Sequence, residues 1–127
     1  SDYSVLVNYF REMKKSVKRH HYKRLMSGDV YYCLSSENHM VCSGWSSSRN
    51  LHLSEIEKTL NIEGNYVLYD FFTPVEFRNN GYYKLILQNI LFHLQSDAYI
   101  YTLKSNKASN KAIQNVGFEK TNIYNFE

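Results

Sequence analysis

The segment Arg78-Asn79-Asn80-Gly81 carries the residues best suited to chemistry, because it places a cation, two amides and a glycine just before a predicted helix. The first turn of a helix presents N–H groups without intrahelical partners at the positive end of the helix dipole. Gly81 lets the backbone turn and approach a ligand closely, and Lys84 adds a second positive charge. The segment therefore predicts a site for a phosphate or pyrophosphate group. On its spacing alone, it also fits a simple turn that starts a helix.

Two motifs give this loop a family context. The run Pro74-Val-Glu-Phe-Arg78-Asn-Asn-Gly81 resembles the acyl-CoA loop of the GCN5-related N-acetyltransferase (GNAT) superfamily. Further along, the run from Asn106 through Ser109 to Gly117-Phe resembles the Asn-x-x-Ser/Ala motif of the same superfamily. The resemblance covers roughly residues 28–126 and is specific from Tyr66 onward. The two linked motifs favour the superfamily over the simple turn.

The resemblance implies acetyl-CoA as the co-substrate and indicates which residues hold it. The end of the central strand would pair with the pantetheine arm through backbone hydrogen bonds and polarise the thioester carbonyl. The loop and first helical turn would bind the pyrophosphate, and Asn106 would contact the CoA arm. The implied cofactor-binding residues are Asp70, Phe71, Phe72, Arg78, Asn79, Asn80, Gly81, Tyr82, Tyr83, Lys84 and Asn106.

Three positions depart from the superfamily pattern. Tyr83 replaces a Gly or Ala of the loop, so its ring is expected to point away from the pyrophosphate. Ile113 stands where many members have a tyrosine that protonates the leaving thiolate. Tyr101 aligns with a glutamate base of some members that acetylate protein N-termini. The remaining catalytic candidates are Asp70 as a base and Tyr101 as a proton donor.

Other chemistries have little support in the sequence. The histidines show no spacing of metal ligands, and two cysteines are too few for a structural zinc site, so no metal is expected. Cys33 and Cys42 have no evident histidine partner for covalent catalysis. They are interpreted as small buried hydrophobic residues, with neighbouring thiols in a hairpin as the alternative. We therefore expect a direct attack of the amine on the thioester within a ternary complex.

The elements that position these residues follow from periodicity and turn signals. Residues 46–50 are predicted as a loop, and residues 51–62 are ambiguous with some helical spacing. The strongest strand is residues 66–73, which is apolar except for Asp70 and ends at Pro74. The other predicted elements are helices at 4–26, 82–96 and 107–115, and strands at 30–34, 40–45, 98–103 and 118–126. The predicted class is mixed α/β, with a GNAT-like acyl-CoA N-acyltransferase fold whose N-terminal elements are shortened.

Length and composition limit the number of domains and the class of protein. With 127 residues, 43% hydrophobic and 21% charged, the chain is expected to form a single globular domain over residues 1–127. No apolar run approaches the roughly 20 residues that span a bilayer, and no signal-peptide layout is present. We therefore expect a cytoplasmic protein without a membrane partner.

The charge is uneven. Residues 11–24 hold seven basic residues and one acid, so this segment carries +6 and the rest of the chain −3. A solvated helix face is the favoured interpretation, and contact with phosphates of a ligand or of RNA is the alternative.

These observations predict an enzyme that transfers an acetyl or other acyl group from acetyl-CoA to the primary amine of a small molecule, with an amino sugar as the analogy. The alternatives are a protein lysine or N-terminal acetyltransferase, and a non-catalytic GNAT-like module whose basic helix contacts RNA. Nucleic acid is the less favoured partner, and a homodimer is left open.

Overall fold

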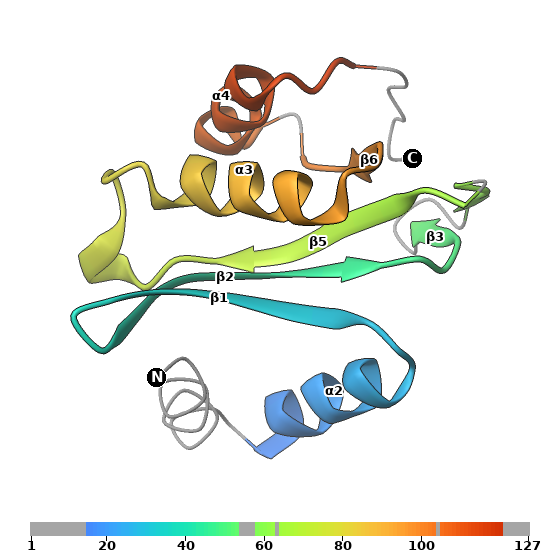
Figure 1. Cartoon of the computed structure of the whole chain (residues 1–127), viewed down its shortest axis with the longest axis horizontal. Helices are drawn as coiled ribbons and strands as arrows, with labels where there is room; N and C mark the ends of the chain where they lie inside the picture. The colour runs from blue at the N-terminus through green and yellow to red at the C-terminus, as the bar shows by residue number, and fades with distance from the viewer. Residues whose placement is uncertain (1–14, 54–57, 63, 104, 121–127) are drawn as a thin grey trace.

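A computed structural model of the chain describes residues 15–53, 58–62, 64–103 and 105–120. They form three layers, with α3 (Tyr82–Leu94) and α4 (Lys107–Val116) on one face of a sheet and α2 (Lys15–Met26) on the other (Figure 1). The sheet consists of β1 (Val30–Ser36), β2 (His39–Ser47), β5 (Tyr66–Phe72) and β6 (Ala98–Ile100). The mixed α/β class predicted from the sequence is confirmed.

The strand order is β1-β2-β5-β6. The pairs β1–β2 and β2–β5 are antiparallel, while β5 and β6 run parallel. The β1–β2 hairpin turns at Glu37 and Asn38, which both have positive φ. The parallel pair is joined by the short 3-10 helix η1 (Val75–Phe77) and by α3.

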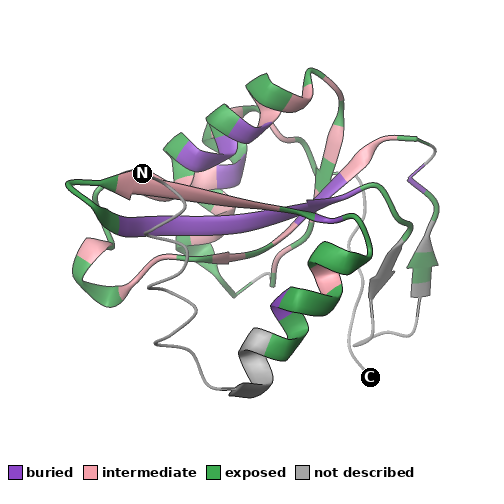
Figure 2. Ribbon diagram, turned by 60° about the horizontal axis from the view of Figure 1, so that its bottom comes forward, coloured by how far each residue is buried: buried purple, intermediate pink, exposed green. Residues whose placement is uncertain are grey.

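The core lies between β2, β5 and the inner face of α3. Its buried side chains include Leu68, Leu87 and Ile90, and Figure 2 shows the buried residues along β2 and on one side of α3. In the same helix, Phe92 and His93 are exposed. The sheet covers only one side of α3, so its apolar face is narrower than the sequence suggests.

The segment before β5 differs most from the prediction. Ser46 and Ser47, expected in a polar loop, extend β2 and are buried. Within the ambiguous segment, β3 (Leu51–Leu53) and β4 (Lys58–Leu60) form a two-stranded antiparallel sheet rather than a helix. Short strands with few apolar residues carry little periodic signal, so cross-strand pairing decides the conformation.

The terminal elements are described in part. The predicted helix at 4–26 is confirmed from residue 15, and its earlier residues lie outside the described part of the chain. β6 ends at Ile100 rather than at residue 103, and residues 118–120 are not in a strand. The rest of the predicted final strand, residues 121–126, also lies outside the described residues.

The two cysteines lie on paired strands but not side by side. Cys33 pairs with Ser43, and Cys42 pairs with Leu34, so the two residues are one step apart in register. Successive side chains of a strand point to opposite faces, so the thiols point to opposite faces of the sheet. Both cysteines are free. The expectation of neighbouring thiols is therefore wrong.

Among the residues that the structure describes, no helix is long and apolar enough to cross a membrane.

Candidate active site

The main cleft opens where β5 and β6 diverge. Their pairing runs from Tyr66–Ala98 to Leu68–Ile100, and no later pair forms between the described parts of the two strands. The cleft has a volume of about 710 Å³ and reaches from the end of β5 to the first turn of α3 and one face of α4. Among the residues that line it are Asp70, Phe71, Phe72, Arg78, Asn79, Gly81, Tyr82, Tyr83, Lys84, Tyr101 and Asn106. The structure thus brings together every predicted site residue except Asn80.

The strand edge in this cleft is shaped by a bulge at Asp70. Trp45 pairs with Tyr69 and Ser43 with Phe72, so the single residue Gly44 of β2 faces two residues of β5. Asp70 has a φ of 56°, in the left-handed region that few non-glycine residues adopt. An extra residue of this kind re-aims the side chains on both sides of it. Residues 69 and 70 therefore both reach the α2 side of the sheet, whereas Phe71 packs on the α3 side.

Gly44 makes room for the bulge. A Cβ atom at this position would overlap the ring of Phe71, which lies against the glycine backbone. Phe71 in turn packs against Tyr83 of α3, with ring centroids 5.3 Å apart. A glycine within a strand often marks a bulge or a close backbone approach, and this one marks both.

The first turn of α3 forms the anion-binding end of the cleft. Gly81 is the N-cap residue, with a left-handed φ of 77° and no side-chain cap. The open N–H groups of this turn belong to Tyr82, Tyr83 and Lys84, because the first helical hydrogen bond runs from Leu85 N–H to the Gly81 carbonyl. This arrangement suits a pyrophosphate, with the helix dipole and Lys84 adding positive potential.

The polar residues before Gly81 hold the loop in shape. The Arg78 Nε–H donates to the carbonyl of Thr73 at 3.0 Å. The Asn80 amide donates to the carbonyls of Phe77 and Arg78, at 3.1 Å each. Asn79 has a positive φ of 65°, which continues the turn. Asn80, predicted as a direct ligand, therefore stabilises the loop from outside the cleft.

The opposite wall of the cleft belongs to α4. Asn106 is its N-cap, and its side-chain oxygen accepts a hydrogen bond from Ser109 N–H at 3.1 Å. Ser109 Oγ donates to the hydroxyl of Tyr83 at 3.2 Å. The Tyr83 ring thus points away from the anion-binding turn, as expected, and its hydroxyl reaches across the cleft to α4. Ile113 is buried in the core.

On the α2 side, Arg24 holds the carboxylate of Asp70. Its Nη1 lies 2.6 Å from Asp70 Oδ2, and the Asp70 side chain is 53% exposed. The guanidinium also lies 5.2 Å from the ring centroid of Trp45 and 5.1 Å from that of Tyr69. Although Asp70 lies in an otherwise apolar strand, its carboxylate is open to solvent on one side and ion-paired with Arg24 on the other.

A second, buried carboxylate holds Arg49 and Tyr69 on the α2 side of the sheet. Asp29 accepts hydrogen bonds from Arg49 at 2.5 and 3.1 Å and from the Tyr69 hydroxyl at 2.5 Å. Burial acts to raise the pKa of Asp29, but hydrogen bonds from Arg49, Tyr69 and Ser47 outweigh it and lower the pKa below its usual value. Asp29 is therefore ionised at neutral pH, and it fixes Tyr69 beside the bulge.

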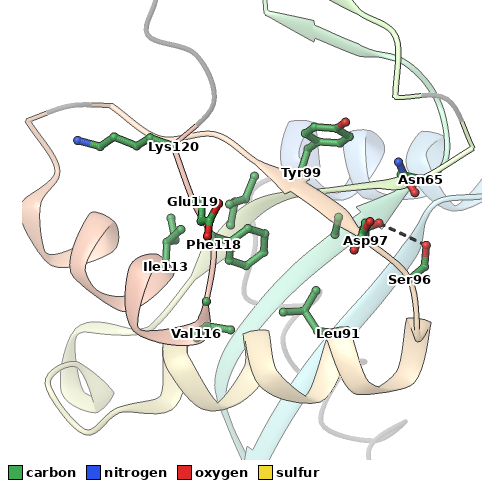
Figure 3. A pocket seen from close by; sticks show the side chains of 13 residues that line it. Asn65, Leu91, Ser96, Asp97, Tyr99, Ile113, Val116, Phe118, Glu119 and Lys120 are labelled. Atoms are coloured by element: carbon green, nitrogen blue, oxygen red, sulfur yellow. Dashed lines mark hydrogen bonds between the residues drawn. The ribbon is translucent and has the colours of Figure 1, made fainter.

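A second cavity, of about 510 Å³, lies at the other end of β6 (Figure 3). Leu91, Tyr99, Val116 and Phe118 stand around it, from α3, β6 and the end of α4. It adjoins the C-terminal end of a helix, where the dipole is negative and N–H groups are already bonded. This cavity is therefore unsuited to a pyrophosphate, and the cleft at the start of α3 is the better candidate.

The sequence did not indicate several residues that shape the site. Arg24 and Asp29 pair with groups far along the chain, and no local pattern marks such contacts. Gly44 was the one detectable signal, since a glycine inside a strand often accompanies a bulge. Tyr101 lies beyond the end of β6, where it lines the cleft and is 47% exposed.

No protein-family model matches the sequence, and no curated protein does. The structure, however, is similar to solved acetyltransferases. The aminoglycoside 6′-N-acetyltransferase AAC(6′)-Ih from Acinetobacter baumannii has a TM-score of 0.67 and 11% identity, over 91% of this chain and 81% of that chain. The aminoglycoside N-acetyltransferase AAC(6′)-Iy, in complex with a bisubstrate analogue of CoA and acetylneamine, has a TM-score of 0.68 and 16% identity, over 91% and 80%.

A predicted acetyltransferase from Clostridium acetobutylicum, solved with acetyl-CoA, has a TM-score of 0.61 and 15% identity, over 87% of this chain and 71% of that chain. At sequence identities this low, the similarity shows the fold alone. The chain therefore has the fold of the GCN5-related N-acetyltransferases, the superfamily that its two cleft motifs resemble.

Proposed function

We propose that the chain is an acetyltransferase that moves an acetyl group from acetyl-CoA to a primary amine of a small molecule. One observation carries this proposal: a single cleft joins the open first turn of α3 to the bulged edge of β5. The turn suits a pyrophosphate, and the strand edge suits an extended arm that ends in a thioester. Among the solved proteins of this fold, some are described with CoA or acetyl-CoA.

The residues of the chain divide the work by position. The N–H groups of Tyr82, Tyr83 and Lys84 would hold the pyrophosphate, and Arg78 adds positive charge at the same end. The backbone of β5 beyond Leu68 would hydrogen-bond the pantetheine arm. At the bulge, a backbone N–H of residues 70–72 would polarise the thioester carbonyl. Acetyl-CoA supplies the acyl group and a thiol leaving group when it is bound.

The amine must reach the thioester as a neutral nucleophile. Asp70 lines the cleft at the bulge and has an exposed carboxylate, so it is placed to take a proton from the attacking nitrogen directly or through water. Arg24 fixes the carboxylate and thereby orients it. We propose Asp70 as the base, and direct attack within a ternary complex as the mechanism.

The acceptor we propose is a small amine, with an amino sugar as the first candidate. Two of the solved proteins of this fold are aminoglycoside acetyltransferases by name. At the bulge, the half-buried ring of Tyr69 and the exposed Asp70 carboxylate both line the cleft and combine apolar surface with a hydrogen-bond acceptor. Such a surface suits a sugar ring that carries an amino group.

A thiol-release assay tests the proposal. The protein and acetyl-CoA would be incubated with one amine at a time. The amines are glucosamine, neamine, a nucleotide-linked amino sugar, a lysine-containing peptide and a peptide with a free N-terminus. Thiol release with one of the sugars, above the rate without protein and absent in Gly81→Glu, would support the proposal. Release with the peptides alone would favour the protein acetyltransferase, and no release with any amine would contradict the proposed function.

A further inference from the structure

Acetyl-CoA does not account for the charge of α2. This helix contains five basic residues and no acidic one, namely Lys15, Lys18, Arg19, Lys23 and Arg24. It covers the face of the sheet opposite α3, whose first turn is the proposed pyrophosphate site (Figure 1). The Asp70 carboxylate is reached from the α2 side, through its ion pair with Arg24. The positive charge on this side is therefore available to the acceptor.

Two arginines from distant segments converge on Tyr69, which lines the cleft. Arg24 of α2 lies over the Tyr69 ring, 5.1 Å from its centroid. Arg49, which follows β2, donates from Nη2 to Asp29 Oδ2 at 2.5 Å. The same oxygen of Asp29 accepts the hydrogen bond from the Tyr69 hydroxyl. The two guanidinium groups thus flank Tyr69, one over its ring and the other beside its hydroxyl.

The charges of the two arginines both act on this hydroxyl. Burial raises the pKa of Tyr69, and the hydrogen bond to Asp29 raises it further, whereas the charges of Arg24 and Arg49 act to lower it. Both cations are therefore close to one polar group of the cleft wall.

Neither arginine is enclosed by its carboxylate partner. Arg49 turns its Nε and Nη2 towards Asp29, and its side chain is still 57% exposed. Arg24 contacts Asp70 through Nη1, and its side chain is 26% exposed. A guanidinium carries five N–H donors, so each arginine can donate to a further oxyanion.

The balance of charge on this face favours an anion. Asp29 and Asp70 each offset one arginine, and no acidic residue within α2 offsets its other basic residues. The potential on this side of the sheet is therefore positive. It attracts an acceptor that carries a phosphate and opposes an acceptor with several ammonium groups.

Resting on the proposed function, we infer that the acceptor is an amino sugar that carries a phosphate group, which Arg24 and Arg49 bind while the amine lies at Asp70. A phosphate has three terminal oxygens, so it can accept charge-assisted hydrogen bonds from both guanidinium groups at once. A carboxylate has two oxygens and matches a single guanidinium. The phosphate takes no part in the acetyl transfer; it holds the sugar so that its nitrogen lies beside the Asp70 carboxylate.

Binding of the acceptor alone tests the inference. Calorimetry without CoA would compare glucosamine, glucosamine 1-phosphate, glucosamine 6-phosphate and neamine. We expect the native chain to bind one of the two phosphates at least roughly tenfold more tightly than glucosamine, and neamine more weakly than glucosamine. The phosphate that binds more tightly identifies the position on the sugar. Equal affinities for glucosamine and both phosphates would overturn the inference.

Three variants locate the phosphate. Asp29→Asn combined with Arg49→Gln removes the guanidinium without leaving a buried carboxylate unpaired, and it should reduce the preference to within about twofold. Lys120→Gln removes an exposed cation at the second cavity and should keep the preference. Gly81→Glu should also keep it, because the α3 turn is on the other face of the sheet. A preference that persists in the double variant, or that disappears in Gly81→Glu, would refute the assignment.

A salt titration of the native chain gives a second answer that does not depend on the folding of a variant. The preference for the phosphate should fall several-fold between about 50 and 500 mM NaCl, because salt screens charges at a partly exposed site. A preference that salt leaves unchanged would overturn the inference.

Thiol release from acetyl-CoA separates this inference from the proposed function. The kcat/KM for the favoured glucosamine phosphate should exceed that for glucosamine and for neamine by roughly tenfold or more, mainly through a lower KM. Equal kcat/KM values for all these amines would refute the phosphate site and leave the acetyltransferase standing. Absence of thiol release with every amine would contradict the proposed function, even where the phosphate binds.

Discussion

Individual residues define the reacting end of the cleft through one irregular contact. The Phe71 ring occupies the space that a Cβ atom at Gly44 would fill, and this contact allows β5 to carry an extra residue against β2. The bulge then places the Asp70 carboxylate on the α2 side and turns Phe71 towards Tyr83. The geometry proposed to bind the thioester thus depends on the absence of a side chain at position 44.

Gly44→Ala is expected to lower the free energy of unfolding by about 1–3 kcal/mol, because the added methyl overlaps the Phe71 ring in a packed core. Urea unfolding measures the change. The matched background is Phe71→Ala, which removes the ring. Gly44→Ala should cost much less there, so the two changes should be strongly non-additive. Additive effects would mean that the contact does not determine the shape of the bulge.

The Arg24–Asp70 pair is expected to matter for turnover more than for stability. Because the pair is partly exposed, Arg24→Ala should change the free energy of unfolding by less than about 1 kcal/mol. Asp70→Asn should lower kcat by roughly 10²-fold, and Arg24→Ala should lower it through the same carboxylate. The double variant should be no slower than Asp70→Asn alone, whereas Lys23→Ala, a change at an exposed neighbour, should leave kcat unchanged. If the two substitutions lowered kcat multiplicatively in the double variant, Arg24 would not act through the Asp70 carboxylate.

At the scale of elements, α2 joins the sheet through His21. Its ring is buried against Tyr31 and Trp45, with edge-to-face contacts at 5.3 and 5.0 Å. Burial lowers the pKa of His21, and the nearby Arg24 lowers it further, while Asp70 opposes the shift. The histidine is therefore neutral in the folded chain at pH 7, and its uncharged ring packs α2 against the sheet.

The pH dependence of stability follows from this shift. In the unfolded chain, a histidine gains a proton near pH 6.5, whereas folded His21 gains it only at a lower pH. The free energy of unfolding should therefore fall as the pH drops below about 6.5. His21→Phe should show a smaller fall between pH 7 and pH 5 in urea unfolding. His93→Phe, at an exposed histidine on the other face, should keep the native dependence, and an unchanged slope in His21→Phe would refute the explanation.

The helices and strands that could be predicted are those marked by local sequence signals. The run at residues 66–72 and the helix after Gly81 were predicted closely, because an apolar strand, Pro74 and a helix-starting glycine mark them in sequence. The β3–β4 hairpin was not, because three-residue strands carry no usable periodicity. For the site, the loop and Asn106 were visible as motifs. The bulge partners Gly44 and Arg24 depend on contacts between distant segments.

For the whole molecule, we propose that one cleft accommodates acetyl-CoA from the α3 turn to the β5 bulge. The single domain over residues 1–127 and a homodimer both stay predictions. A bound ligand stabilises the folded state by about 2.7 kcal/mol at a hundredfold excess over Kd. Acetyl-CoA should therefore also raise the Tm of the native chain.

Calorimetric titration measures whether acetyl-CoA binds in this cleft, using three proteins: the native chain, Gly81→Glu and Gly64→Glu. Gly81 and Gly64 have similar left-handed φ values, 77° and 81°, and open space around them, so the two substitutions impose similar strain. Only position 81 would place a carboxylate where the pyrophosphate is proposed to bind. We predict micromolar binding by the native chain and by Gly64→Glu, with loss of binding in Gly81→Glu. Absence of binding by the folded native chain, or equal binding by all three proteins, would mean that acetyl-CoA does not bind at the α3 turn.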